Sequence, residues 1–141
     1  MAQIDKPSLH FNTKLYTGNG TDNHAITGVG FQPDFVWIKT RSTTGFHRLQ
    51  DAVRGATKEI YSNSSQAEGT DTNTLKSFDS DGFTLGTTAD YNGNGRTQVS
   101  WNWKANGAGS SNSDGSINST VSANTTAGFS IVKWVGNGSA G

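Results

Sequence analysis

The stretch that decides the fold of this 141-residue chain is Phe31–Thr40, which reads FQPDFVWIKT. After its proline, aromatic and β-branched residues follow one another without a break. In a strand, Phe35 and Trp37 point to one face while Val36 and Ile38 point to the other. Because both faces are apolar, such a strand needs cover on both sides. The stretch therefore predicts the central strand of a layered β protein.

The composition agrees with an all-β domain. Gly, Ser, Thr and Asn make up 65 of the 141 residues, and only 31% of the residues are hydrophobic. This mixture disfavours helices and suits thin sheets joined by long polar loops. Disorder is the competing interpretation, but four Trp, seven Phe and three Tyr recur in alternating runs that disordered chains lack.

Charge and cysteine content exclude several kinds of site. Eleven Lys and Arg balance eleven Asp and Glu, and no basic patch with interleaved aromatic residues occurs, so we expect no nucleic-acid partner. No apolar run approaches the length of a membrane span, and no signal peptide is recognisable, so we expect no membrane partner. The absence of cysteine excludes disulfides, thiolate metal sites and cysteine nucleophiles.

The second strongest strand is 97–104, TQVSWNWK. Its alternation predicts a buried face with Val99, Trp101 and Trp103, and a wet face that includes Ser100 and Asn102. Further strands are expected at 11–17, 24–29, 46–51, 58–62, 83–86, 116–121 and 128–135, with a helix as the alternative over 51–59. Residues 79–82 predict a turn, residues 64–73 and 89–95 loops, and residues 106–115 a flexible linker.

An internal repeat organises the chain. The segment 11–21, FNTKLYTGNGT, aligns with 129–139, FSIVKWVGNGS, at an offset of 118 residues. Both copies contain the first aromatic residue, the second aromatic residue five positions later, and the Gly-Asn-Gly turn. We therefore expect an arm at 1–10 and a β-sandwich unit at 11–127. Residues 128–141 are then the first strand and turn of a second unit, which would make the chain a fragment, or the closing strand of the first unit.

Several runs resemble a repeat domain of virion proteins of marine bacteriophages. They are YTGNG (16–20), ITGVGFQPDFVWIKTRS (26–42), DAVRGATKEIYSNSSQAEGTDTN (51–73), FDSDGFTLGT (78–87) and VSWNWKANG (99–107). The resemblance covers nearly all of residues 11–141 and implies a concanavalin A-like sandwich in a tail fibre or other particle-surface component. Its motifs are structural glycines and aromatic residues, and it implies no catalytic residues.

The fold expected from these observations is an all-β, antiparallel β-sandwich of the jelly-roll, concanavalin A-like type. Its expected core is formed by nine apolar residues, namely Phe35, Val36, Trp37, Ile38, Val99, Trp101, Trp103, Phe129 and Ile131. We expect the tryptophans to pack in this core rather than to form an exposed sugar-binding platform.

Two groups of residues are candidates for binding. Asp79 and Asp81, in the run Asp-Ser-Asp-Gly, resemble the opening of a calcium loop, although no glutamate follows at the required distance and a plain turn is the alternative. The second group is a candidate glycan site, with Tyr91 expected to be exposed at a loop tip beside hydrogen-bonding side chains. Its members are Asp90, Tyr91, Asn92, Asn94 and Arg96.

The function expected from the sequence is a non-enzymatic structural or adhesive module on the bacteriophage virion surface, made in the host cytoplasm. Its expected partners are other virion proteins, copies of itself and, as a further candidate, a host surface glycan. No cofactor is expected apart from the possible calcium. A calcium-dependent carbohydrate-binding module is the first alternative. A polysaccharide-degrading enzyme is the second, but no pair of facing carboxyl groups can be named for it.

Overall fold

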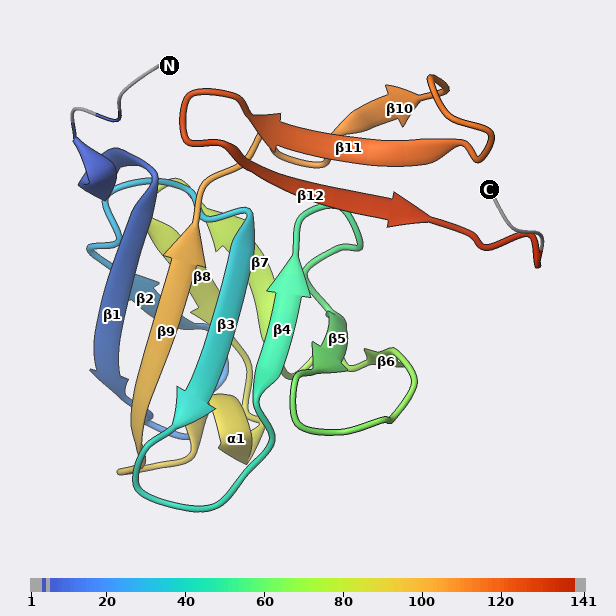
Figure 1. Ribbon diagram of the computed structural model, residues 1–141. Coiled ribbons are helices and arrows are strands. Elements are labelled where there is room, and N and C mark those ends of the chain that lie inside the picture. The colour runs from blue at the N-terminus through green and yellow to red at the C-terminus, as the bar shows by residue number, and fades with distance from the viewer. Residues whose placement is uncertain (1–3, 5, 139–141) are drawn as a thin grey trace.

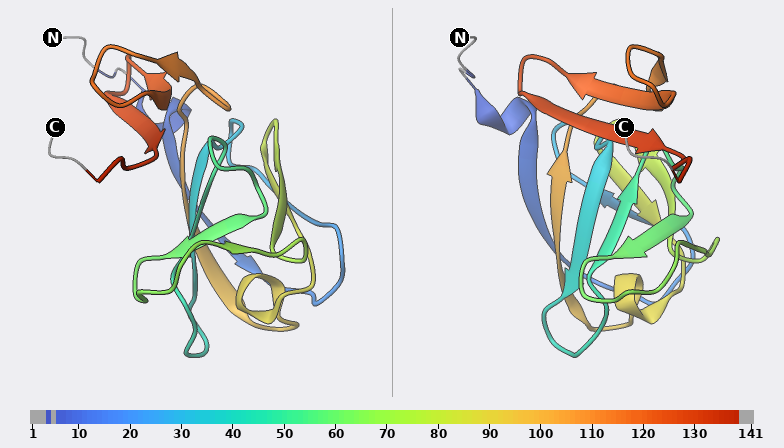
Figure 2. Two further views of the ribbon diagram at one scale, coloured as in Figure 1. Left: turned by 90° about the vertical axis from the view of Figure 1, so that its right-hand side faces the viewer. Right: turned by 45° about the vertical axis from the view of Figure 1, so that its right-hand side comes forward.

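The computed structural model describes residues 4 and 6–138 and has three antiparallel sheets (Figure 1). The predicted arm at 1–10 and the segment 128–141 therefore lie partly outside the described residues. The first sheet has six strands in the order β1-β9-β3-β4-β5-β6, the second is β2-β8-β7, and the third is β10-β11-β12. The first two sheets face each other as a β-sandwich (Figures 1 and 2). The predicted all-β antiparallel sandwich is thus confirmed.

The elements follow one another along the chain with short connections. The strands are β1 Phe11–Thr17, β2 His24–Thr27, β3 Phe35–Thr40, β4 Arg48–Asp51, β5 Lys58–Tyr61, β6 Gly69–Thr70, β7 Leu75–Asp79, β8 Gly82–Leu85, β9 Thr97–Trp103, β10 Ser110–Asn112, β11 Ser119–Asn124 and β12 Phe129–Trp134. The helical turns are η1 Pro7–Leu9 and α1 Ala89–Asn92. In the described part of the chain, no helix has the length and apolar character needed to cross a membrane.

The sandwich core is centred on β3, as the sequence predicts. Val36 and Ile38 point inward and are almost completely buried. They pack in one cluster with apolar side chains of the opposite sheet and of α1, namely Ile26, Leu75, Phe83, Leu85 and Tyr91. Burying an aliphatic or aromatic side chain of this size contributes about 1.5–3 kcal/mol relative to an exposed position. The small cluster therefore accounts for much of the driving force that joins the two sheets.

The predicted orientation of β9 is wrong. Ser100 and Asn102, predicted on a wet face, are fully buried between the sheets, whereas Trp101 and Trp103 point outward and are only half-buried. The Asn102 amide donates to the Asn12 carbonyl oxygen and to the Ser100 hydroxyl. These bonds satisfy the amide donor inside the sandwich, whereas Asn102 Oδ1 and the side-chain amide of Gln98 are buried on the same face without a hydrogen-bond partner among the described residues.

The predicted core list needs a matching correction. Phe35 and Trp37 alternate with the buried Val36 and Ile38, so they point to the outer side of the six-stranded sheet, where they are half-buried. Val99 is buried, but it shares the outer side with the tryptophans of β9. Phe129 and Ile131 are half-buried and belong to the third sheet, not to the sandwich.

Some predicted boundaries also differ from the structure. The helix offered as an alternative over 51–59 does not form, because β4 and β5 occupy its ends. Residues 89–92, predicted as loop, form α1. The predicted linker 106–115 contains β10, and the strand predicted at 116–121 is β11, the middle strand of its sheet.

The turn predicted at 79–82 is confirmed, since Asp79 pairs with Gly82 across the β7–β8 hairpin. Gly82 adopts a φ of 153°, and a Cβ there would lie 1.9 Å from the Ile26 carbonyl oxygen. Only glycine meets both requirements.

Candidate functional site

The outer face is the side of the six-stranded sheet turned away from β2-β8-β7 (Figure 2). One row of cross-strand neighbours on it reads Thr13, Trp101, Trp37, Leu49 and Ile60. The rings of Trp37 and Trp101 pack at 5.4 Å between centroids. In β9, the side chains that point outward are thus more apolar than the side chains that point inward. Contiguous apolar surfaces of this kind mark interaction sites in soluble proteins.

The third sheet covers one end of the outer face. In Figure 1, β12 crosses the ends of the strands of the six-stranded sheet. Phe129 stacks on Trp103 at 6.1 Å between ring centroids, and Phe35 lies edge-on to both rings. These contacts fix the third sheet against the sandwich and leave the rest of the aromatic row uncovered by it.

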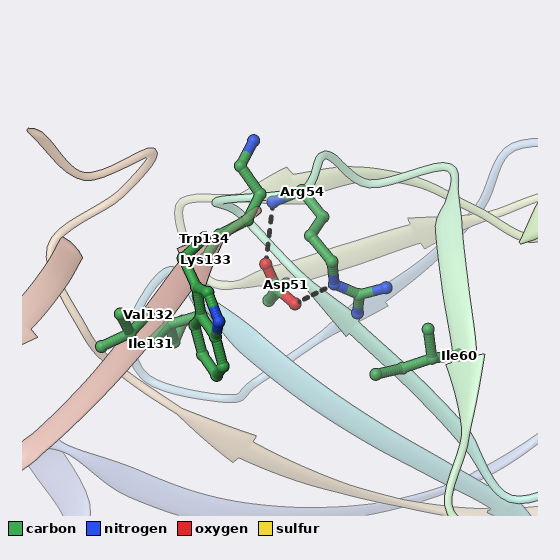
Figure 3. Close-up of a pocket in the computed structure, with 7 residues that line it drawn as sticks. All are labelled: Asp51, Arg54, Ile60, Ile131, Val132, Lys133 and Trp134. Carbon is green, nitrogen blue, oxygen red and sulfur yellow. Dashed lines mark hydrogen bonds and ion pairs between the residues drawn. The ribbon is translucent and has the colours of Figure 1, made fainter. Parts of the chain in front are cut away.

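A pocket of about 270 Å³ lies where β12 meets β4 and β5. We call it the edge pocket. It is lined by Asp51, Arg54, Ile60, Ile131, Val132, Lys133 and Trp134. Figure 3 shows the Trp134 indole on one side and Ile60 on the other, with Asp51 and Arg54 between them. The lining therefore combines one flat aromatic ring, aliphatic side chains and a fixed ion pair.

The guanidinium of Arg54 is held in place by three acceptors. Its Nε donates to Asp51 Oδ2 at 2.6 Å, one terminal nitrogen donates to the Leu49 carbonyl oxygen at 3.1 Å, and the other pairs with Glu68 at 3.3 Å. The Arg54 amide also donates to Asp51 Oδ1 at 2.8 Å (Figure 3). Since a guanidinium has five N–H donors, this arrangement fixes its orientation and leaves donors for a ligand.

Trp134 is the most exposed tryptophan on this side of the molecule, with 62% of its surface accessible. Val132 and Val135 beside it are also exposed, at 45% and 83%. Together with the edge pocket, these residues form a surface that can bind an apolar or planar group and orient it by hydrogen bonds. Sequence reasoning missed this surface because no spacing rule links residues 51–60 to residues 131–135. The only signal was the apolar character of the last strand.

The predicted glycan site at residues 90–96 does not form as expected. Tyr91, predicted to be exposed, is fully buried, and so is Asn92. Both belong to α1, which packs against β3 and turns the Tyr91 ring into the core. Asp90 bonds Arg48, and Arg96 lies 3.7 Å from Asp90. Of the five predicted residues, Asn94 alone is classed as exposed.

A buried polar network lies beneath α1 instead. Arg48 donates to Glu59 at 2.7 Å and to Asp90 at 2.8 Å, and the hydroxyls of Tyr61 and Tyr91 donate to the Glu59 carboxylate. Burial, followed by the charge of Glu59, raises the pKa of Tyr91 well above 10.0, and burial also raises that of Tyr61. Both phenols therefore stay protonated donors to Glu59, and the bonds join Arg48, Glu59 and Asp90 into one structural network, in which the buried Arg48 Nε has no hydrogen-bond partner among the described residues.

The predicted calcium ligands are bound to protein donors. Asp79 accepts hydrogen bonds from the hydroxyls of Ser77 and Thr84, at 2.8 and 2.7 Å. Asp81 accepts from the amides of Gly28 and Gly30, at 2.9 and 2.6 Å. Within residues 4 and 6–138, no group of three or more His, Cys, Asp or Glu side chains that could hold a metal ion is found. The Asp79 carboxylate thus connects β7 with β8, and the Asp81 carboxylate connects the hairpin turn with the segment after β2.

Asp81 predicts a pH-dependent contribution to stability. Its bonds from the Gly30 and Gly28 amides lower its pKa below the ordinary 3.8. Ionised Asp81 therefore stabilises the fold above that value, and its contribution is lost as the pH falls through the folded-state pKa. We expect Asp81→Asn to lower the urea midpoint at neutral pH, with a difference from wild type that shrinks below pH 3.8. Asp114→Asn, in an exposed loop, is the control; a pH-independent difference for Asp81→Asn would contradict the assignment.

The fold and this surface define an all-β sandwich domain with a partly covered aromatic outer face and an edge pocket. Residues 6–141 match the family described as "Domain of unknown function (DUF7483)", and the chain belongs to that family. No curated protein and no solved structure was found to match the chain.

Proposed function

We propose that this domain is a non-enzymatic structural or adhesive module of the bacteriophage virion surface. Its place is in capsid decoration or in a fibre or tail appendage, and its partners are other virion proteins and copies of itself. One observation carries the proposal. The half-buried row of Trp101, Trp37, Leu49 and Ile60 continues at the edge pocket into the exposed Val132 and Trp134. An apolar surface with central aromatic residues and a polar rim is the usual composition of a protein interface.

The resemblance of the sequence to virion repeat domains supports the same proposal, as does the internal repeat. Repeated units convert weak single contacts into strong binding, because each contact after the first is intramolecular. A jelly-roll, concanavalin A-like topology is part of the proposal. The buried carboxylates of Glu59 and Asp51 are engaged by Arg48 and Arg54. These paired acids therefore support a structural role rather than acid–base catalysis.

Purified virions of the phage that encodes this chain are expected to contain it. Mass spectrometry of gradient-purified particles, with the same fraction from a knockout lysate as the control, makes the test. The chain should be found in a fixed ratio to the major capsid protein, because a structural component has a fixed copy number. Its absence from intact particles would overturn the proposal.

A carbohydrate-binding module is the second candidate, and the edge pocket favours it. An exposed indole such as that of Trp134 can stack on the apolar face of a sugar, and the fixed Arg54 guanidinium can donate to hydroxyl groups. Binding of the domain on a glycan array, lost in Trp134→Ala, would favour this candidate over a purely structural role. An EDTA arm of the same experiment tests dependence on calcium.

A further inference from the structure

The two copies of the internal repeat have different surroundings in the structure. The first copy is β1 with the turn Gly18–Gly20, and the second is β12 with the turn Gly136–Gly138. Both β1 and β12 are edge strands, since β1 pairs with β9 and β12 with β11 on one side within the described residues. The repeat therefore allows two related segments to be compared in two environments.

The first turn is tightly bound by residues 92–96, which begin with the last residue of α1. The Gly18 amide donates to the Arg96 carbonyl oxygen at 2.9 Å, and the Gly20 amide donates to that of Asn92 at 2.7 Å. The Gly95 amide donates to the Gly18 carbonyl oxygen at 2.9 Å. Two residues before Gly18, in β1, the Tyr16 hydroxyl donates to the Tyr91 carbonyl oxygen at 2.9 Å.

Close approach explains why the first position of this turn is glycine. A Cβ on Gly18 would lie 2.4 Å from the Gly93 carbonyl oxygen and 2.6 Å from the Asn92 carbonyl carbon. Both atoms belong to the backbone and cannot move aside cheaply. The backbone of Gly18 itself does not have a positive φ, so the contact with the loop is what requires glycine there.

The second turn has the same glycine without that contact. Around Gly136, no described atom lies within 4 Å of the position of a Cβ, and φ is again not positive. The side chain that corresponds to Tyr16 is Trp134, which is 62% exposed, and the next residue, Val135, is 83% exposed. At Gly136 and Trp134 the sequence therefore keeps features that serve a close contact in the first copy, whereas the described part of this unit places no atom near the Gly136 Cβ position and leaves most of Trp134 exposed.

We propose that β12 and its turn are a docking strand for another unit of this same fold. That unit receives Phe129–Gly138 as its first strand, beside its own counterpart of β9, and its counterpart of residues 92–96 binds the Gly-Asn-Gly turn. β12 has an open edge for this pairing while it keeps β11 on the other side, so adjacent units share one strand. This strand addition gives the assembly in the proposed function a defined contact, and it rests on that proposal.

A fusion protein tests the contact directly. Residues 1–138 are joined to residues 21–141, so that β12 is the only first strand available to the second unit. Limited proteolysis and intact-mass measurement then show how much of the fusion is folded. We expect the entire fusion to resist cleavage, and the amplitude of its unfolding transition per molecule to be about twice that of the single chain, because two folded units then unfold.

Single substitutions separate docking from folding. Gly136→Ala is expected to leave the urea midpoint of the single chain unchanged, because its surroundings are open. In the fusion, the Cβ added at position 136 would clash with the second unit's counterpart of residues 92–96. Only the first unit should then resist cleavage. Gly115→Ala, at another open glycine without positive φ, is the matched control and should behave like wild type. Trp134→Tyr restores the residue of the first copy and should also keep both units protected.

A wild-type fusion with one protected unit, or a Gly136→Ala fusion as resistant as wild type, would overturn the docking strand. Neither result affects the detection of the chain in purified virions. The two proposals therefore fail independently.

Discussion

Replacement of Arg48 by methionine is expected to lower the free energy of unfolding by about 3–5 kcal/mol, the usual cost of removing one partner from a buried ion pair. The Arg48 side chain is 10% exposed and that of Glu59 7%, at an N–O distance of 2.7 Å. Without the guanidinium, the Glu59 carboxylate keeps only the hydroxyl donors of Tyr61 and Tyr91 and stays out of reach of water. Urea denaturation at neutral pH measures the loss.

The aromatic rings around Arg48 add to this loss. Its guanidinium carbon lies 5.1 Å from the ring centroid of Phe46, 4.8 Å from that of Tyr61 and 5.4 Å from that of Tyr91. Cation–π contacts contribute most when the cation is desolvated, as it is here. Methionine can replace much of the packing volume but not the charge, so the variant isolates the electrostatic part.

Two further variants decide whether the lost charge is the cause. Arg48→Met/Glu59→Gln should be less destabilised than the sum of the single changes, because the buried carboxylate is no longer left without its cation. Lys76→Met removes the cation of the exposed pair with Asp22, at 2.8 Å, and should cost no more than about 1 kcal/mol. An Arg48→Met protein as stable as Lys76→Met would show that the buried network contributes little.

The fold class was predictable because the local sequence of β3 alone indicates a strand of a layered β protein. Phe35–Thr40 is apolar on both faces: its inner face is buried in the sandwich core, and its outer face is half-buried within the aromatic row. The orientation of β9 was not predictable from its pattern. A strand with tryptophans at alternate positions predicts that those positions are buried, and this rule fails where an apolar outer face serves another contact. The misassigned face is the one on which the proposed interaction surface lies.

The candidate site was less predictable for a different reason. Asn, Asp and Gly favour turns, so the run from Asp90 to Arg96 predicted an exposed loop. Tyr91 and Asn92 are buried there because β1 and the turn after it bind α1, through contacts between residues some 70 positions apart in sequence. Arg54 and Trp134 meet at the edge pocket by the same kind of long-range contact. Local pattern contains no signal for either.

Replacement of Asn92 by alanine is the second change with a large expected effect. Its Oδ1 accepts from the Asn19 amide at 2.9 Å and lies 2.7 Å from His24 Nδ1, and its Nδ2 donates to the carbonyl oxygens of Thr21 and Gly86, both at 2.8 Å. Four hydrogen bonds thus connect the turn after β1, the start of β2 and the residue after β8. Each buried group left without its partner costs about 1–3 kcal/mol.

We expect Asn92→Ala to lower the free energy of unfolding by about 3–5 kcal/mol, because the Gly86 carbonyl oxygen is left unpaired in the interior and three part-buried hydrogen bonds are lost with it. Asn94, two residues along the same loop, is exposed, and Asn94→Ala should stay within about 0.5 kcal/mol of wild type. Hydrogen exchange should show faster exchange at the Asn19 amide in Asn92→Ala alone. If the two alanine variants unfold at the same urea concentration, Asn92 does not organise this end of the sandwich, and the first copy of the repeat is not bound by its loop as the structure describes.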